Sequence, residues 1–239
     1  MQRVYHNWYS PALGRNMELL VFGHAGAPVL VFPTSGGRYW EYEDRGMVGA
    51  LAHQIENGWL QLICVDQVYA ETYYSYGRDS NARLWRHDQY EHYLLTEVLP
   101  LIRHMNPNPY LMATGCSMGA TEALNFTLRH PGVISRAIGL SGAYDIRQFY
   151  RHYTDAVYFH NPVDFVPNMN DSWQIERLRN TDIILVTGSD DHISVGSSRQ
   201  IAGQLWAKGI GNALRVWNGW YHDWPYWQQM INRYIGGHD

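Results

Sequence analysis

The chain has 239 residues, of which 46% are apolar and 17% are charged, and its formal net charge is −4. This composition excludes an intrinsically disordered chain and supports a sizeable buried core, so one α/β domain spanning residues 1–239 is expected. Lys208 is the only lysine among eighteen basic residues and no basic run occurs. Nucleic acid is therefore not expected as a partner.

The cysteines and the N-terminal segment bear on the cellular compartment. Cys64 and Cys116 both lie in apolar segments, which favours two buried thiols over a disulfide. Residues 1–16 contain no apolar signal-peptide core, and no stretch approaches the roughly eighteen apolar residues that a membrane span requires. We therefore expect no membrane span and a cytoplasmic location.

Short runs rich in Val, Ile and Leu alternate with amphipathic segments, which is typical of a mostly parallel sheet buried on both faces. The first clear strand is 29–32, and a helix from Met47 to Gly58 separates it from a strand at 60–65. A long helix then places apolar residues on one face between positions 90 and 105. Pro100 is expected to kink this helix.

The second half of the chain continues this alternation without a repeat or a linker. The expected strands are 110–114, 137–140, 183–187 and 214–217, and the expected helices are 120–129, 197–208 and a last one around 227–234. The pattern predicts one doubly wound α/β domain with helices on both faces of the sheet.

Residues 115–119 read Gly-Cys-Ser-Met-Gly and match G-x-S-x-G, the motif of a strained turn that exposes a nucleophilic serine. By chance such a chain contains roughly 0.1 matches, so the motif alone does not exclude an ordinary tight turn. The strand before it and the helix after it are the context that a nucleophile elbow requires. We therefore predict Ser117 as the nucleophile.

A nucleophilic serine needs a histidine base, which in turn is oriented by a carboxylate. Two aspartates, Asp190 and Asp191, follow the expected strand 183–187 at its carboxyl end, where such sheets place functional groups. The spacing G-x-x-D from Gly188 favours Asp191 and leaves Asp190 as a turn or cap residue. Both remain candidates for the acid.

The histidine base is expected after the last strand. His222 lies there, and Pro225 is placed to open the final helix. His192 is the rival candidate, but its position beside the acid turn fits a site wall or a surface residue better. We predict His222 as the base.

The oxyanion of an acyl-transfer intermediate requires preorganised N–H donors. One is expected from Met118, directly after the nucleophile, and the other from Ser35 in the Gly-rich loop after strand 29–32, with Gly36 as the alternative donor. The same loop residues also fit a tight connection without a catalytic role. We place Gly36 and Trp224 in the substrate-binding surface.

Together these motifs resemble the esterase D-like group of α/β-hydrolases, which includes S-formylglutathione hydrolases, feruloyl and acetyl-xylan esterases and mycolyltransferases. The similarity covers most of residues 29–227 and rests on segments 97–102, 115–120, 188–191 and 222–227. The resemblance implies an α/β-hydrolase fold and a serine carboxylesterase that forms an acyl-enzyme, with Ser117, an aspartate and His222 as its triad. Segment 33–37 departs from the group because it lacks the His-Gly start common in hydrolases.

Substrate preference is expected to depend on the aromatic segments 69–76 and 144–173, the second being the natural place for a cap-like insertion. Their side chains fit an acyl or sugar subsite and equally a small satellite core. The expected partner is a small-molecule or carbohydrate-linked ester. An acyltransferase with the same triad and a catalytically idle binding protein are the alternatives, and the oligomeric state stays open.

No metal or nucleotide cofactor is expected from the sequence. Neither an H-E-x-x-H nor a C-x-x-C spacing occurs, and no phosphate-binding glycine motif is present. His87 and His92 are near each other on an expected helix, but a five-residue separation places them on different faces.

Overall fold

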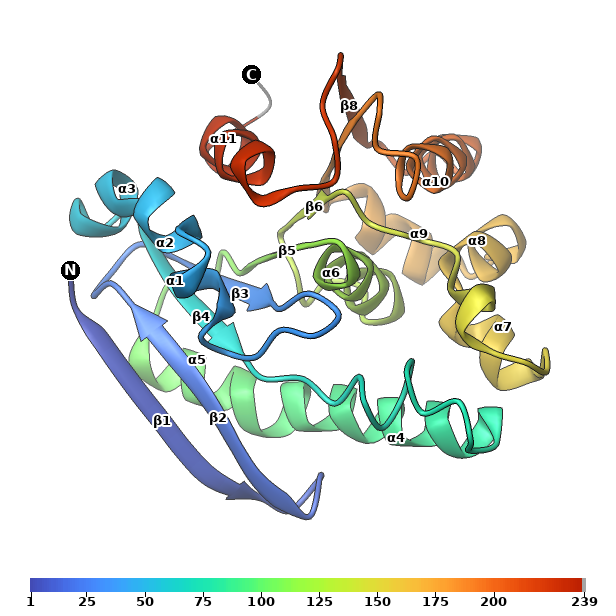
Figure 1. Ribbon diagram of the computed structural model, residues 1–239, viewed down its shortest axis with the longest axis horizontal. Coiled ribbons are helices and arrows are strands. Elements are labelled where there is room, and N and C mark those ends of the chain that lie inside the picture. The colour runs from blue at the N-terminus through green and yellow to red at the C-terminus, as the bar shows by residue number, and fades with distance from the viewer. Residues whose placement is uncertain (238–239) are drawn as a thin grey trace.

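An eight-stranded sheet runs through the computed structural model, which describes residues 1–237 (Figure 1). Its strand order is β1-β2-β4-β3-β5-β6-β7-β8; the pairs β1/β2 and β2/β4 are antiparallel and all other pairs are parallel. The expected mostly parallel α/β sheet is therefore confirmed. The strands are β1 (Arg3–Ser10), β2 (Arg15–Phe22), β3 (Ala27–Phe32), β4 (Leu60–Val65), β5 (Met112–Cys116), β6 (Arg136–Leu140), β7 (Asp182–Gly188) and β8 (Ala213–Trp217).

Helices cover both faces of this sheet. Along β3, Val29 packs into one apolar core and Leu30 into another, because successive side chains of a strand point to opposite faces. The first core includes α1 (Glu41–Asp44), α2 (Met47–Ala50), α3 (Ala52–Glu56) and α11 (Trp224–Tyr234). The opposite face packs against α4 (Ser80–Tyr93), the π-helical turn η1 (Leu94–Val98), α5 (Leu99–Met105), α6 (Met118–Arg129) and α10 (Val195–Ala207).

The segment between β6 and β7 contains short helices, coloured yellow-green to orange in Figure 1. Tyr144 packs with residues of α6 and α10, and Tyr150 packs beside Met118, whereas Tyr153 and Phe159 are exposed. The aromatic residues of this segment thus divide between buried clusters and the surface. The helices are η2 (Ile146–Phe149), α7 (Asp155–His160), α8 (Pro162–Phe165), η3 (Val166–Asn168) and α9 (Ser172–Arg179).

Three elements differ from the expectations. The hairpin β1/β2 was not expected, because β1 is an edge strand whose mostly polar and aromatic side chains alternate between exposed and half-buried without an apolar run. The long helix is interrupted by η1 immediately before Pro100, whose missing N–H cannot continue an α-helical ladder. The expected helix 47–58 is two short helices, the second of which ends at Glu56, and Gly58 follows it with a φ of +69°.

Two other expectations concern the cysteines and the membrane. Cys64 and Cys116 are free and buried, as expected. Among residues 1–237, no helix has the length and apolar character needed to cross a membrane.

Candidate active site

The turn after β5 places Ser117 directly before α6, as its N-cap residue, with φ 54° and ψ −118°, outside the helical region. Both flanking glycines are required by close backbone approach. A Cβ on Gly115 would lie 2.4 Å from the carbonyl carbon of Gly119, and a Cβ on Gly119 would lie 2.3 Å from the carbonyl oxygen of Phe32. Only glycine fits at these two positions, so the segment forms the sharp turn that its motif predicts.

His222 lies between Ser117 and Asp191. Its Nε2 is 2.9 Å from Ser117 Oγ, and its Nδ1 is 2.9 Å from Asp191 Oδ2. The loop that carries His222 ends where Asp223 caps α11, with Pro225 in the first turn of that helix as expected. The side chain of His222 is 19% exposed and that of Asp191 is fully buried, so the arrangement opens to solvent on the side of the histidine and the serine.

Four donors surround the Asp191 carboxylate. Besides His222, the backbone N–H groups of Ile193 and Ser194 donate to Oδ1 at 3.2 Å each, and the Ser194 hydroxyl donates to Oδ2 at 2.6 Å. Burial opposes ionisation, but the hydrogen bonds from His222 and Ser194, together with the nearby Ser141 side chain, outweigh it and lower the pKa of Asp191 to about 2. Asp191 is therefore a carboxylate at neutral pH.

The two rival candidates lie elsewhere. Asp190 accepts a hydrogen bond from the hydroxyl of Ser189 at 2.8 Å within its own turn, and His192 is exposed. The structure thus brings Asp191, and not Asp190, to His222.

The loop after β3 is a turn whose outer amides are occupied. Gly37 N–H donates to the carbonyl oxygen of Thr34 at 3.1 Å, and Glu41 accepts the backbone N–H of Thr34 at 2.8 Å and its hydroxyl at 2.7 Å. Within residues 1–237, no hydrogen bond engages the N–H groups of Ser35, Gly36 or Met118.

The start of α6 lies against this loop, because Gly119 approaches the carbonyl oxygens of Phe32 and Pro33. The loop with the free Ser35 amide therefore packs against the helix N-terminus that carries the free Met118 amide. The hydroxyl of Tyr74 donates to Ser35 Oγ at 2.6 Å and fixes the loop further.

The two residues expected to bind substrate differ in exposure. Gly36 is exposed, whereas Trp224 is half-buried and packs edge-on against Trp227 with ring centroids 5.0 Å apart. The Arg45 guanidinium lies 5.6 Å from the centroid of the Trp224 ring.

Sequence reasoning missed Glu41, Tyr74, Ser141 and Ser194, which hold the loop and the acid. Each comes from a different element, and only Ser194, three residues after Asp191, lies near a recognised motif. Sequence spacing does not reveal such partners, because folding alone brings them together.

A second group of ionisable residues, His87, Glu91 and Glu122, is buried between α4 and α6. Glu122 lies 3.0 Å from Nε2 of His87, whereas Glu91 lies 3.7 Å from its Nδ1. The carboxylates face opposite nitrogens of one imidazole, and one ligand atom of each residue lies within 4.8 Å of the others. Glu91 is also held by Arg129, at 2.8 and 2.9 Å.

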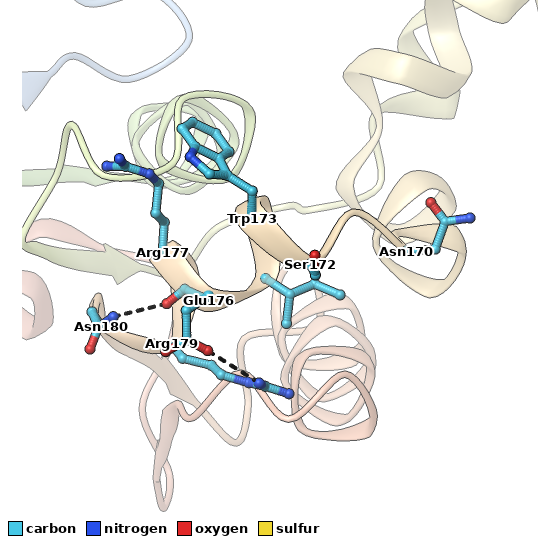
Figure 2. A pocket seen from close by; sticks show the side chains of 8 residues that line it. Asn170, Ser172, Trp173, Glu176, Arg177, Arg179 and Asn180 are labelled. Carbon is cyan, nitrogen blue, oxygen red and sulfur yellow. Dashed lines mark hydrogen bonds and ion pairs between the residues drawn. The ribbon is translucent and has the colours of Figure 1, made fainter.

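Figure 2 shows a pocket along α9 that contains none of the candidate catalytic residues. The Arg177 guanidinium lies 4.4 Å from the Trp173 ring centroid, and Arg179 forms an ion pair with Glu176 at 3.4 Å. The pocket offers no arrangement of a nucleophile and a base.

Comparison with known proteins gives the family of the chain and agrees with the fold. The family described as "Putative esterase" matches residues 64–236, most of the chain, so the chain belongs to this family and is an ester hydrolase. No curated protein matches the sequence.

Solved structures show the α/β-hydrolase fold. A ferulic acid esterase matches with a TM-score of 0.80 and 18% identity, over 98% of this chain and 96% of that chain. The fluorophosphonate-binding serine hydrolase FphF of Staphylococcus aureus matches with a TM-score of 0.77 and 17% identity, over 98% and 97%. An S-formylglutathione hydrolase from Agrobacterium tumefaciens matches with a TM-score of 0.76 and 12% identity, over 98% and 93%.

Proposed function

We propose that Ser117, His222 and Asp191 form a catalytic triad that hydrolyses carboxylic esters through an acyl-enzyme. The observation that carries the proposal is the pair of 2.9 Å contacts that link a serine on a strained turn, both nitrogens of one imidazole and a buried carboxylate. The family and the expected order of serine, acid and histidine along the chain support it.

The geometry supports a two-step reaction. Ser117 Oγ attacks the ester carbonyl carbon while its proton passes to Nε2 of His222, and Asp191 stabilises the resulting imidazolium through Nδ1–H. The N–H groups of Met118 and Ser35 donate to the oxyanion, aided by the positive end of the α6 dipole. The C–O bond then breaks, and the leaving alkoxide takes the proton from Nε2.

Water completes the cycle. His222 removes a proton from a water molecule, whose oxygen attacks the acyl carbon, and collapse of the second intermediate returns that proton to Ser117 Oγ. An acyltransferase would differ only in using another alcohol instead of water at this step. Hydrolysis is proposed because the chain belongs to an esterase family.

The substrate is proposed to be a small-molecule or carbohydrate-linked ester. Gly36 and Trp224 border the proposed oxyanion and base positions, and the fold is shared with a ferulic acid esterase. The organisation of residues 1–239 as a single domain stays a prediction. The last two of these residues lie outside the part of the chain that the structure describes. The cap-like role of 144–173 and the cytoplasmic location also stay predictions.

The test compares wild type with Ser117→Ala on p-nitrophenyl acetate and p-nitrophenyl butyrate. The variant is expected to lose about 10⁴- to 10⁶-fold in kcat/KM with an unchanged Tm. A fluorophosphonate probe should label wild type and not the variant. A folded wild type that neither turns over esters nor accepts the probe would overturn the proposal and favour a binding protein.

A further inference from the structure

Two non-glycine residues among 1–237 have positive φ angles, and they follow neighbouring strands. Ser117 (φ 54°) follows β5, and Ser141 (φ 56°) follows β6. This conformation is unfavourable for residues with a side chain and persists where the surrounding structure holds it, often at functional sites. Ser117 is the proposed nucleophile, whereas Ser141 has no role in the mechanism above.

Trp227 of α11 forms a hydrogen bond with the side chain of Ser141, in which the indole is the donor and the serine oxygen is the acceptor. Both residues are buried, and the indole Nε1–H donates to Ser141 Oγ at 2.9 Å. Because an indole N–H can only donate, the serine oxygen is the acceptor and its own proton is free for another partner. The backbone N–H of Ser141 donates to Val186 at 2.7 Å and ties the residue to β7, the strand that leads to Asp191.

The side chain of Ser141 lies close enough to Asp191 to lower the pKa of its carboxylate. Ser194 donates to the same carboxylate at 2.6 Å and lies 2.7 Å from the hydroxyl of Thr187, which therefore acts as its donor. The Ser194 hydroxyl, whose direction is set by Thr187, thus binds the acid. The Ser141 hydroxyl, whose oxygen accepts from Trp227, favours the ionised form of the same carboxylate. A carboxylate held in this way stays ionised and in one orientation.

Trp227 also contacts the base. Its ring meets the His222 imidazole edge-on, with centroids 4.9 Å apart and an angle of 87° between the planes. Trp227 therefore packs against the histidine and also fixes Ser141, the side chain that lowers the pKa of the aspartate.

We propose that Ser141 and Trp227 are positioning residues that hold the Asp191–His222 pair in its reactive arrangement. This inference rests on the proposed function, because it assigns both residues to the triad of that reaction. Neither residue is proposed to touch the substrate, so their effect should appear in kcat and in its pH dependence more than in KM.

The chain offers a matched control of the same chemistry. On β1, Ser10 Oγ and Trp8 Nε1 each donate to Glu97 at 2.7 Å, far along the sheet from Ser117. Ser10→Ala and Trp8→Phe thus remove the same donors from a carboxylate that has no role in the reaction. These two control variants measure how much the loss of such a hydrogen-bond donor lowers the stability of the fold, without any effect on the reaction.

The experiment measures kcat, KM, Tm and the pH profile of kcat/KM with p-nitrophenyl acetate. The variants are Ser141→Ala, Ser141→Gly, Trp227→Phe and the double variant Ser141→Ala/Trp227→Phe. Glycine tolerates the positive φ, so Ser141→Gly removes the hydroxyl without backbone strain. Phenylalanine keeps a ring beside His222 and removes the N–H donor.

Each single variant is expected to lose about tenfold in kcat with KM nearly unchanged. The acid limb of the profile is expected to move about half a unit to higher pH, because a carboxylate with fewer donors attracts the imidazole proton more strongly. The double variant should lose little more activity than either single variant, because both substitutions remove the same hydrogen bond between Trp227 and Ser141. Ser10→Ala and Trp8→Phe should keep wild-type kinetics.

Wild-type kcat and an unshifted acid limb in folded Ser141→Gly and Trp227→Phe would overturn the inference, even with a lowered Tm. If Ser141→Ala fails to fold, these two variants decide the outcome. An inactive wild type, or a Ser117→Ala variant that keeps full activity, would instead overturn the proposed function, and the inference with it.

Discussion

Two places in the molecule join a histidine to a hydroxyl and a carboxylate, and they differ in how the imidazole is used. In the candidate active site, Ser117 and Asp191 lie at opposite nitrogens of His222. In the buried cluster between α4 and α6, the hydroxyl of Tyr73 and the carboxylate of Glu122 both lie at Nε2 of His87, at 3.2 and 3.0 Å.

This difference separates a reactive arrangement from a structural one. An imidazole can accept a proton at one nitrogen while donating from the other, as His222 is placed to do. His87 cannot act in this way between Tyr73 and Glu122, and it has no exposure to solvent. A hydroxyl, an imidazole and a carboxylate thus form the proposed catalytic site at the strand ends. Between α4 and α6, the same three kinds of group form a buried ion pair with a structural role.

The largest expected effect tests the two histidines against each other. His222→Gln should reduce kcat/KM by about 10⁴- to 10⁶-fold, because the nucleophile loses its base, while Tm changes little. His87→Gln should keep kcat/KM per folded molecule within a few-fold of wild type. Steady-state kinetics on both variants, corrected for the folded fraction, check this. Equal losses of activity would remove the distinction between the two sites.

A smaller effect is expected from the acid. Asp191→Asn should reduce kcat by about 10⁴-fold, because an amide no longer stabilises the imidazolium or selects its tautomer. Asp190→Asn is the matched control and should leave turnover near wild type, since the Asp190 carboxylate accepts its hydrogen bond from Ser189 in the same turn. Kinetics with p-nitrophenyl acetate decide between them. A strong loss in Asp190→Asn alone would assign the acid to Asp190 instead.

In the buried cluster the expected effect is on stability. Glu122→Gln removes the carboxylate beside His87 and should lower the free energy of unfolding by about 3 kcal/mol, because one member of a buried charge pair is left uncompensated. Urea unfolding followed by circular dichroism measures this change. Glu176→Gln, on exposed α9, serves as a control with little expected effect. A Glu122→Gln variant as stable as wild type would show that the pair contributes nothing net.

The smallest expected effect is the pH dependence of this cluster. Burial opposes a charge on His87, but Glu122 and Glu91 outweigh burial and the nearby Arg129, and the pKa of His87 is raised above 6.5. Its contribution to stability is therefore fully present below pH 6.5 and is lost as the pH rises through the raised value. Unfolding free energies of wild type and His87→Gln should converge as the pH rises. A constant difference across the range would show that His87 does not titrate there.

The motifs at the strand ends were recognisable because each occupies a few consecutive residues. The segment 115–119 contains the serine and both of the glycines that its close packing requires, and the order of Ser117, acid and His222 along the chain follows the order of the strands. The mostly parallel sheet was predictable from apolar runs, since strands buried on both faces need them. The β1/β2 hairpin was not, because an edge strand lacks such a run.

Sequence by itself determined the fold class, the strained serine turn and the residues from which a triad was predicted. It did not decide between Asp190 and Asp191, because the side chains of two neighbouring residues in a turn point in different directions and the sequence does not show which one faces the histidine. Only the tertiary structure placed Asp191 at His222, joined Ser141 and Trp227 to that pair, and buried His87 against Glu122. The hydrogen bonds among these contacts join residues 31, 35 and 86 positions apart in the chain. Residues so far apart in the chain come into contact only when the sheet and the helices pack together, so no local sequence pattern predicts these contacts.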